Sequence, residues 1–69
     1  MVKITLSNKI GNTVLEYESN SIPHKGEHIY LAHHGTFEIL DVIYHVTDDR
    51  DYNEMEELLF VDVLIEEVL

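Results

Sequence analysis

The alternation of apolar and polar residues constrains the fold of this chain most strongly. Leu15 and Tyr17 alternate with Glu16 and Glu18, and residues 2–7 follow the same rule. Successive side chains of a strand point to opposite faces, so a period of two residues indicates a strand with one buried face. The apolar positions are crowded with β-branched and aromatic residues, which favour strands. The sequence therefore predicts an all-β protein.

Turn residues divide this pattern into five expected strands. Gly11-Asn12 separates the first two strands, which we expect to form a β-hairpin. Pro23 and Gly26 interrupt the pattern before the third strand. His34-Gly35 is expected to make a two-residue hairpin turn between the third and fourth strands, because type I′ turns need positive φ. The expected strands cover residues 2–7, 13–19, 27–33, 36–47 and 59–66.

The fourth expected strand changes parity along its length. Its apolar residues are Phe37 and Ile39, then Val42, Tyr44 and Val46. One extra residue near Leu40-Asp41 would place both sets on the same face, as a β-bulge does, and would bend the strand. The alternative is a central strand that is apolar on both faces, because Leu40 and Ile43 are also apolar. We favour the bulge, and we expect Tyr17, Phe37, Tyr44 and Phe60 in the core.

The C-terminal segment supports two interpretations. Alternating apolar residues from Leu59 to Ile65 predict a strand. Asn53, with Glu56 three residues later, could instead cap a helix. The run from Phe60 to Ile65 is rich in strand-forming residues, so we favour the strand.

The length of 69 residues allows one domain, residues 1–69. A chain of this size buries only about 60% of the surface that its unfolded form exposes, and it has no cysteine for a disulfide. A homodimer would add buried area, and both the monomer and the homodimer stay open. A compact monomer of this length has a radius of gyration of about 11 Å.

Residues 20–48 carry a recurrent pattern. Pro23-His24-Lys25-Gly26-Glu27-His28-Ile29-Tyr30-Leu31 reads as Pro-x-x-Gly-acidic-x-aliphatic-x-aliphatic, and Phe37, Ile39 and Val42 follow it. This pattern resembles one in small, mostly uncharacterised bacterial and phage proteins with an SH3-like barrel. The resemblance implies a small five-stranded SH3-like β-barrel, and it carries no activity because the matching positions define a fold.

The charge balance limits the function. Fourteen Asp and Glu residues face four Lys and Arg residues, a formal net charge of −10. Such a chain would repel nucleic acid and anionic membranes, so we expect neither as a direct partner; a basic surface on another macromolecule suits it. The N-terminal residues contain no apolar run of the length of a signal peptide or membrane span, so we expect a cytoplasmic protein.

One segment concentrates the acidic residues, and it is the main candidate for partner binding. It supplies Asp48, Asp49, Asp51, Tyr52, Glu54, Glu56 and Glu57. To these we add Glu16 and Glu18, about 6.6 Å apart along a strand, and Tyr30 as an aromatic anchor. Three interpretations stay open: a solvated loop, a docking surface for a basic partner, or a surface that imitates the phosphates of DNA.

Metal binding and catalysis find little support. The acidic segment departs from the EF-hand order, with Glu54 at the obligatory glycine and Phe60 at the terminal ligand. The five histidines do not show the spacing of a zinc site. Cysteine is absent, and each of the three glycines stands alone in a turn rather than in a phosphate-binding loop. We expect no cofactor, no metal and no enzymatic activity.

The function that we predict is therefore binding. We expect an acidic phage-type inhibitor or modulator that docks on a basic surface of a bacterial host protein, and a nucleic-acid-binding groove is one candidate for that surface. The first alternative is a structural subunit of a homo-oligomeric or virion assembly. The second is a His/carboxylate metal-binding protein.

Overall fold

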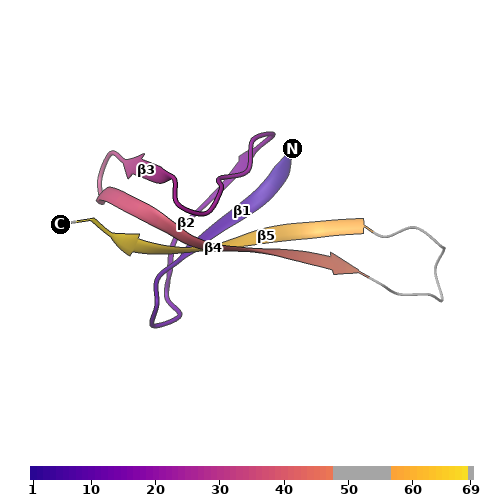
Figure 1. Ribbon diagram of the computed structural model, residues 1–69. Helices are drawn as coiled ribbons and strands as arrows, with labels where there is room; N and C mark the ends of the chain where they lie inside the picture. The colour runs from indigo at the N-terminus through magenta and orange to yellow at the C-terminus, as the bar shows by residue number, and fades with distance from the viewer. Residues whose placement is uncertain (48–56, 69) are drawn as a thin grey trace.

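The computed structural model describes residues 1–47 and 57–68, and all of its regular structure is strand (Figure 1). The predicted acidic segment 48–56 lies outside the described residues. Within the described part of the chain, no helix is long and apolar enough to cross a membrane. The five strands are β1 (Val2–Ser7), β2 (Thr13–Ser19), β3 (His28–Leu31), β4 (Gly35–Thr47) and β5 (Glu57–Glu67). The prediction of an all-β chain with five strands is confirmed, and the C-terminal segment is a strand rather than a helix.

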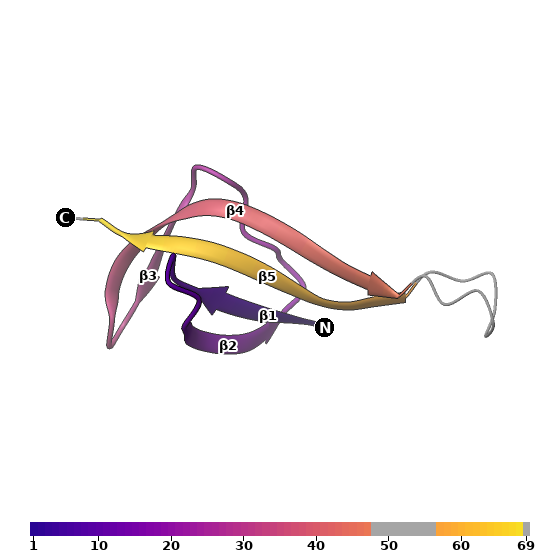
Figure 2. The same cartoon turned by 90° about the horizontal axis from the view of Figure 1, so that it is seen from below.

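The strands form one sheet in the order β2-β1-β5-β4-β3. The β1–β5 pair is parallel, and the other three pairs are antiparallel. The sheet curls into half of a barrel, with β2 and β3 at its two edges (Figures 1 and 2). The C-terminal strand β5 is therefore the centre of the sheet, between β4, which precedes it in sequence, and the N-terminal strand β1.

The β1–β2 hairpin closes through a turn that its own asparagine stabilises. The side-chain Oδ1 of Asn8 accepts hydrogen bonds from the backbone N–H groups of Ile10 and Asn12. Gly11 sits at φ 91°, a conformation that residues with a Cβ rarely adopt. The register places Leu15 and Tyr17 on the same face as Leu6 and Ile4, as the alternation predicts.

The connection between β3 and β4 differs from the prediction. β3 ends at Leu31, which pairs with Gly35, so three residues rather than two form the turn. The N–H of His34 donates to the Leu31 carbonyl at 3.0 Å, and Gly35 takes positive φ, at 101°. This is the usual form of a three-residue hairpin, with a glycine after a tight turn. The prediction of a His34-Gly35 two-residue turn is wrong because Leu31 pairs with Gly35, so that residues 32–34 form the turn and Gly35 already belongs to β4.

The predicted β-bulge is confirmed. Between Ile39 and Asp41 the β4–β5 register shifts by one residue, and Leu40 is the extra residue. As a result Ile39 pairs with Ile65 and Val42 pairs with Val63, all on one face. The bulge thereby keeps Phe37 and Ile39, which precede it, and Val42, which follows it, on the core side of a 13-residue strand.

The core lies on the inner side of the curled sheet, which we call the core face. Eight apolar residues from β1, β3, β4 and β5 are buried there: Ile4, Leu6, Leu31, Phe37, Ile39, Val61, Val63 and Ile65. Val2, Val14, Tyr17, Ile22, Ile29 and Val42 pack against them. Ile22 comes from the segment between β2 and β3, so this segment covers part of the open side of the half-barrel.

The molecule is longer than a compact chain of its size. Its radius of gyration is 13.6 Å, against the expected value of about 11 Å, and its longest extent is 47 Å. β4 and β5 run out together beyond β1, β2 and β3 (Figures 1 and 2). We call residues 43–47 and 57–60 the arm.

Two predicted core aromatics lie in the arm instead. Tyr44 is 53% exposed, because within the described chain β1 pairs with β5 only from Val61 onward and no strand covers this end of the sheet. Phe60 pairs with His45 on the face opposite the core and stacks on its ring.

Candidate functional site

Carboxylates gather on the side of the sheet opposite the core, which we call the outer face. The structure describes eight acidic side chains, and the strand register places six of them on this face. They come from β2, β4 and β5: Glu16, Glu18, Glu38, Asp41, Asp62 and Glu66. The other two are Glu27, between β2 and β3, and Glu67, opposite the core residue Phe37.

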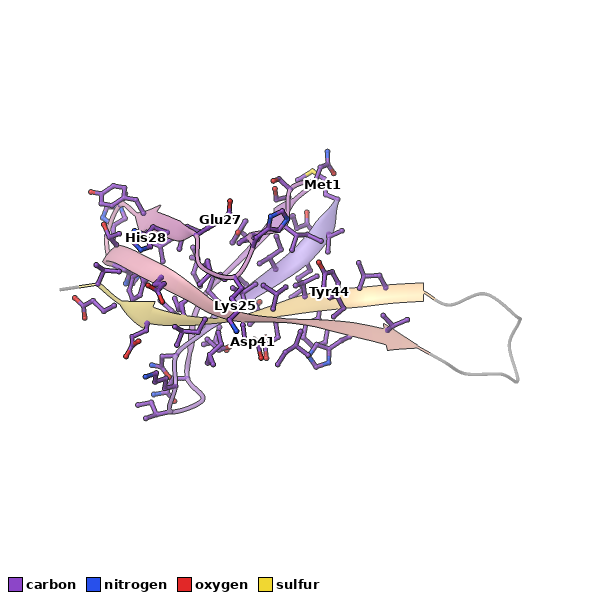
Figure 3. The ribbon with its side chains drawn as sticks, in the orientation of Figure 1. Met1, Lys25, Glu27, His28, Asp41 and Tyr44 are labelled. Atoms are coloured by element: carbon purple, nitrogen blue, oxygen red, sulfur yellow. The ribbon has the colours of Figure 1, made fainter. Side chains whose placement is uncertain are left out.

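This arrangement follows from the pleat of the sheet. Residues paired across neighbouring strands share a face, and neighbouring strands lie about 4.8 Å apart. One row across the sheet contains Glu16 of β2, Thr5 of β1 and Asp62 of β5. Another contains Glu66 of β5, Glu38 of β4 and His28 of β3 (Figure 3 labels His28). The outer face therefore presents carboxylates over most of the width of the sheet.

Neighbouring cations and hydrogen-bond donors reduce the repulsion between these carboxylates. Glu38 and Glu66 are directly opposite, an arrangement that destabilises a sheet unless each has a partner. The Nζ of Lys9 lies 2.8 Å from Glu66, and His28 Nε2 lies 3.8 Å from Glu38. Lys3 Nζ lies 3.7 Å from Glu16. These groups are about half exposed, so each pair adds little stability and leaves the carboxylates accessible.

Two more of these carboxylates accept hydrogen bonds from a hydroxyl or a backbone N–H group. The Ser7 hydroxyl donates to Asp62 at 3.1 Å, and the Val42 N–H donates to the neighbouring Asp41 side chain at 2.9 Å. Six carboxylates thus share the outer face with the two ammonium groups of Lys3 and Lys9, and the face keeps a clear negative excess.

The predicted site residues fall into three groups. Glu16 and Glu18 lie on β2 with both side chains exposed on the outer face. Tyr30 lies on β3 on the same face, 71% exposed, but β3 is the opposite edge of the sheet, so Tyr30 is not close to this pair. Asp48, Asp49, Asp51, Tyr52, Glu54 and Glu56 lie outside the described residues. Glu57 begins β5, and its side chain is likewise outside what the structure describes.

The prediction missed the four outer-face carboxylates of β4 and β5. Glu38, Asp41, Asp62 and Glu66 are scattered in the sequence, and only Glu66 has an acidic neighbour, Glu67. The alternation does mark Asp62 and Glu66 as opposite in face to Val61 and Val63. Their closeness to Glu16 depends on the parallel β1–β5 pairing, which no local pattern indicates.

The described residues offer no ready site for a metal ion. Within residues 1–47 and 57–68 no group of three or more His, Asp or Glu side chains is placed to hold one. Two of the five histidines each lie near one glutamate: His24 Nδ1 lies 3.9 Å from Glu27, and His28 lies near Glu38.

His45 is an unusual polar group in the arm. Its ring stacks on Phe60 with a centroid separation of 4.0 Å and an interplanar angle of 9°. Its Nε2 atom is buried without a hydrogen-bond partner in the described chain. A buried unpaired polar atom costs about 1–3 kcal/mol, which opposes the favourable stack of this ring on Phe60.

Comparison with known proteins assigns this chain to no family. No family model matches the chain, and neither the curated proteins nor the solved structures contain a significant match.

Proposed function

We propose that this chain is a non-enzymatic acidic binding protein, a phage-type inhibitor or modulator that docks on a basic surface of a bacterial protein. The observation that carries the proposal is the placement of six of the eight described carboxylates on one face of the sheet. A face with a negative excess attracts a basic surface over a longer range than the same charges scattered around the molecule.

The geometry of the face suits a partner with regularly spaced cations. Glu16 and Glu18 are two residues apart on one strand, about 6.6 Å, and Asp62 lies two strands from Glu16, about 10 Å. A groove that binds the phosphates of a nucleic acid presents cations along a line in a comparable way. We therefore propose a nucleic-acid-binding groove of the bacterial protein as the docking surface.

Association of this kind depends on salt. Electrostatic steering raises association rates by about tenfold to a thousandfold, and salt removes this gain because the Debye length falls from about 10 Å at 0.1 M to about 3 Å at 1 M. Tyr30 offers an exposed ring at the β3 edge of the same face for buried contact.

A pull-down from bacterial lysate tests the proposal. The tagged chain is washed first at low and then at high salt, and a parallel sample is washed with duplex DNA. We expect one stoichiometric protein that both salt and DNA release. Recovery of the chain alone, or of a protein that high salt does not release, would contradict the proposal.

A further inference from the structure

The arm of the sheet carries exposed apolar side chains. Ile43, Tyr44, Val46 and Leu58 are each between 38% and 53% exposed. The register places Val46 opposite Leu58 and Tyr44 opposite Val61, so Tyr44, Val46 and Leu58 continue the core face beyond the point where β1 pairs with β5. Ile43, opposite Asp62, lies on the outer face. Among the described residues, the core face thus has an uncovered apolar end.

The same stretch of β4 has an open backbone edge. β3 pairs with β4 only at residues 35–38, and the backbone of Gly26 and Glu27 bonds to Ile39. In the described parts of the chain, no strand lies beside β4 from Val42 onward on this side. An exposed apolar strand edge is a template for pairing with another strand.

The direction of the free backbone groups follows from the bulge. Residues of a strand that share a face also direct their N–H and C=O groups to the same side. Ile39 directs its groups toward β3, because its N–H donates to the Glu27 carbonyl and its carbonyl accepts from Gly26. The bulge puts Val42 on the face of Ile39, and the Val42 N–H is bonded by the Asp41 carboxylate instead of a strand. Tyr44 and Val46 therefore direct N–H and C=O groups to the open edge.

We propose that this chain forms a two-fold symmetric homodimer in which β4 pairs antiparallel with β4 of a second copy along this edge. Tyr44 lies opposite Tyr44 of the second copy, and Val42 lies opposite Val46. In this register the residues with outward N–H and C=O groups meet each other, as antiparallel pairing requires, and the Val42 N–H exchanges the Asp41 carboxylate for the Val46 carbonyl of the second copy. Aromatic and β-branched side chains then face one another on the core side, which are favourable cross-strand pairs.

The exposed area of the molecule leaves room for a second copy. A compact monomer of 8.0 kDa exposes roughly 4,400 Å², and this chain exposes 5347 Å². The excess of roughly 900 Å² belongs to the whole molecule and includes the exposed side chains of the arm, and a standard interface takes about 800 Å² from each partner. The paired residues 42–46 carry no carboxylate, although Asp41 and Asp48 flank them, so no two carboxylates lie directly opposite each other within the paired stretch.

The proposed homodimer is independent of the proposed function, and the two proposals predict opposite responses to salt. Each copy has a net charge of −10, so repulsion opposes self-association and salt screens it. Dimerisation therefore strengthens with salt, whereas docking on a basic protein weakens.

Sedimentation equilibrium of the full chain, at low and high salt, tests the dimer. We expect a mass of about 16 kDa, twice the 8.0 kDa of one chain, with tighter association at high salt. Tyr44→Asp should raise the dimer dissociation constant by about thirtyfold or more, because it puts two carboxylates opposite each other at the centre of the interface. Tyr30→Asp is the matched control: the same change at a more exposed tyrosine on the outer face should leave the dimer intact.

A proline pair tests the strand pairing itself. Val46→Pro removes an N–H that points to the open edge, so the circular dichroism spectrum should persist while the dimer is lost. His45→Pro removes an N–H that points to β5, so it should unfold the arm. A monomeric wild type at both salt concentrations, a dimer that survives Tyr44→Asp and Val46→Pro, or equal loss in Tyr44→Asp and Tyr30→Asp would each overturn the proposed interface.

Discussion

The assignment of residues to the core face predicts very different costs for one chemical change at two isoleucines. Ile65 lies on β5, opposite Ile39, and is fully buried. Ile43 lies on β4 on the outer face and is 47% exposed. Ile65→Ala and Ile43→Ala remove the same three carbon atoms, so the pair isolates the effect of position.

The cost at Ile65 is large relative to the stability of the chain. Three buried carbons are worth about 2.4 kcal/mol of transfer free energy at about 0.8 kcal/mol each. The cavity that remains brings the usual cost of this change to about 2–5 kcal/mol. A 69-residue domain has a free energy of unfolding of only about 3.5–10 kcal/mol. Ile43→Ala should cost less than about 1 kcal/mol, which reflects mainly the lower strand propensity of alanine.

Urea unfolding followed by circular dichroism measures both costs. We expect the midpoint to fall by about 1 M or more for Ile65→Ala, with an unchanged slope, and by much less for Ile43→Ala. Ile65→Val, which removes one methylene, should fall between them at about 0.5–1.5 kcal/mol. Equal losses for the two alanine variants would refute the assignment of the faces and the β4–β5 register.

Three further predictions concern single side chains. Burial raises the pKa of Tyr17 above its ordinary value of 10.0, so the folded state favours the neutral phenol. The free energy of unfolding therefore falls as the pH rises past about 10. Urea titrations between about pH 9 and 11 should show that Tyr17→Phe removes this fall. Gly35→Ala should lower the unfolding free energy by about 1–2 kcal/mol through backbone strain alone, because an added Cβ would meet nothing within 4 Å; an unchanged melting temperature would contradict this. His45→Phe should raise the free energy of unfolding by about 1 kcal/mol in the same urea assay, because the buried, unpaired Nε2 disappears while the stack on Phe60 can remain. A fall of similar size in the free energy of unfolding would contradict this prediction.

Local patterns in the sequence predicted much of the fold. The bounds of β1 and β2 agree with the alternation, because each strand has one buried face and one solvated face. The parity change between Ile39 and Val42 correctly located the β-bulge, since only an extra residue keeps both on the core face. The β3–β4 turn was predicted one residue too short, because the sequence does not show that Leu31 pairs with Gly35.

Long-range pairing could not be read from the sequence. β5 was the least certain strand and forms the centre of the sheet, because its pairing with β1 and β4 on either side leaves no signal in its local sequence. Tyr44 has the alternation of a core residue, yet it is exposed because β1 pairs with β5 only from Val61 onward. Of the candidate site, Glu16 and Glu18 were placed correctly on the outer face, whereas their alignment with Asp62 required the parallel β1–β5 register.

The affinity of two charge-reversed variants for the protein captured from lysate tests the central proposal most directly. Glu16→Lys with Glu18→Lys reverses two charges on the outer face, and Glu27→Lys with Glu67→Lys makes the same change in net charge away from it. Calorimetric titration at two salt concentrations should show a large loss of affinity and a reduced salt dependence for the first variant, with a small loss for the second. Equal losses for both variants would mean that net charge, and not the outer face, drives binding, and the proposal of a docking face would be wrong.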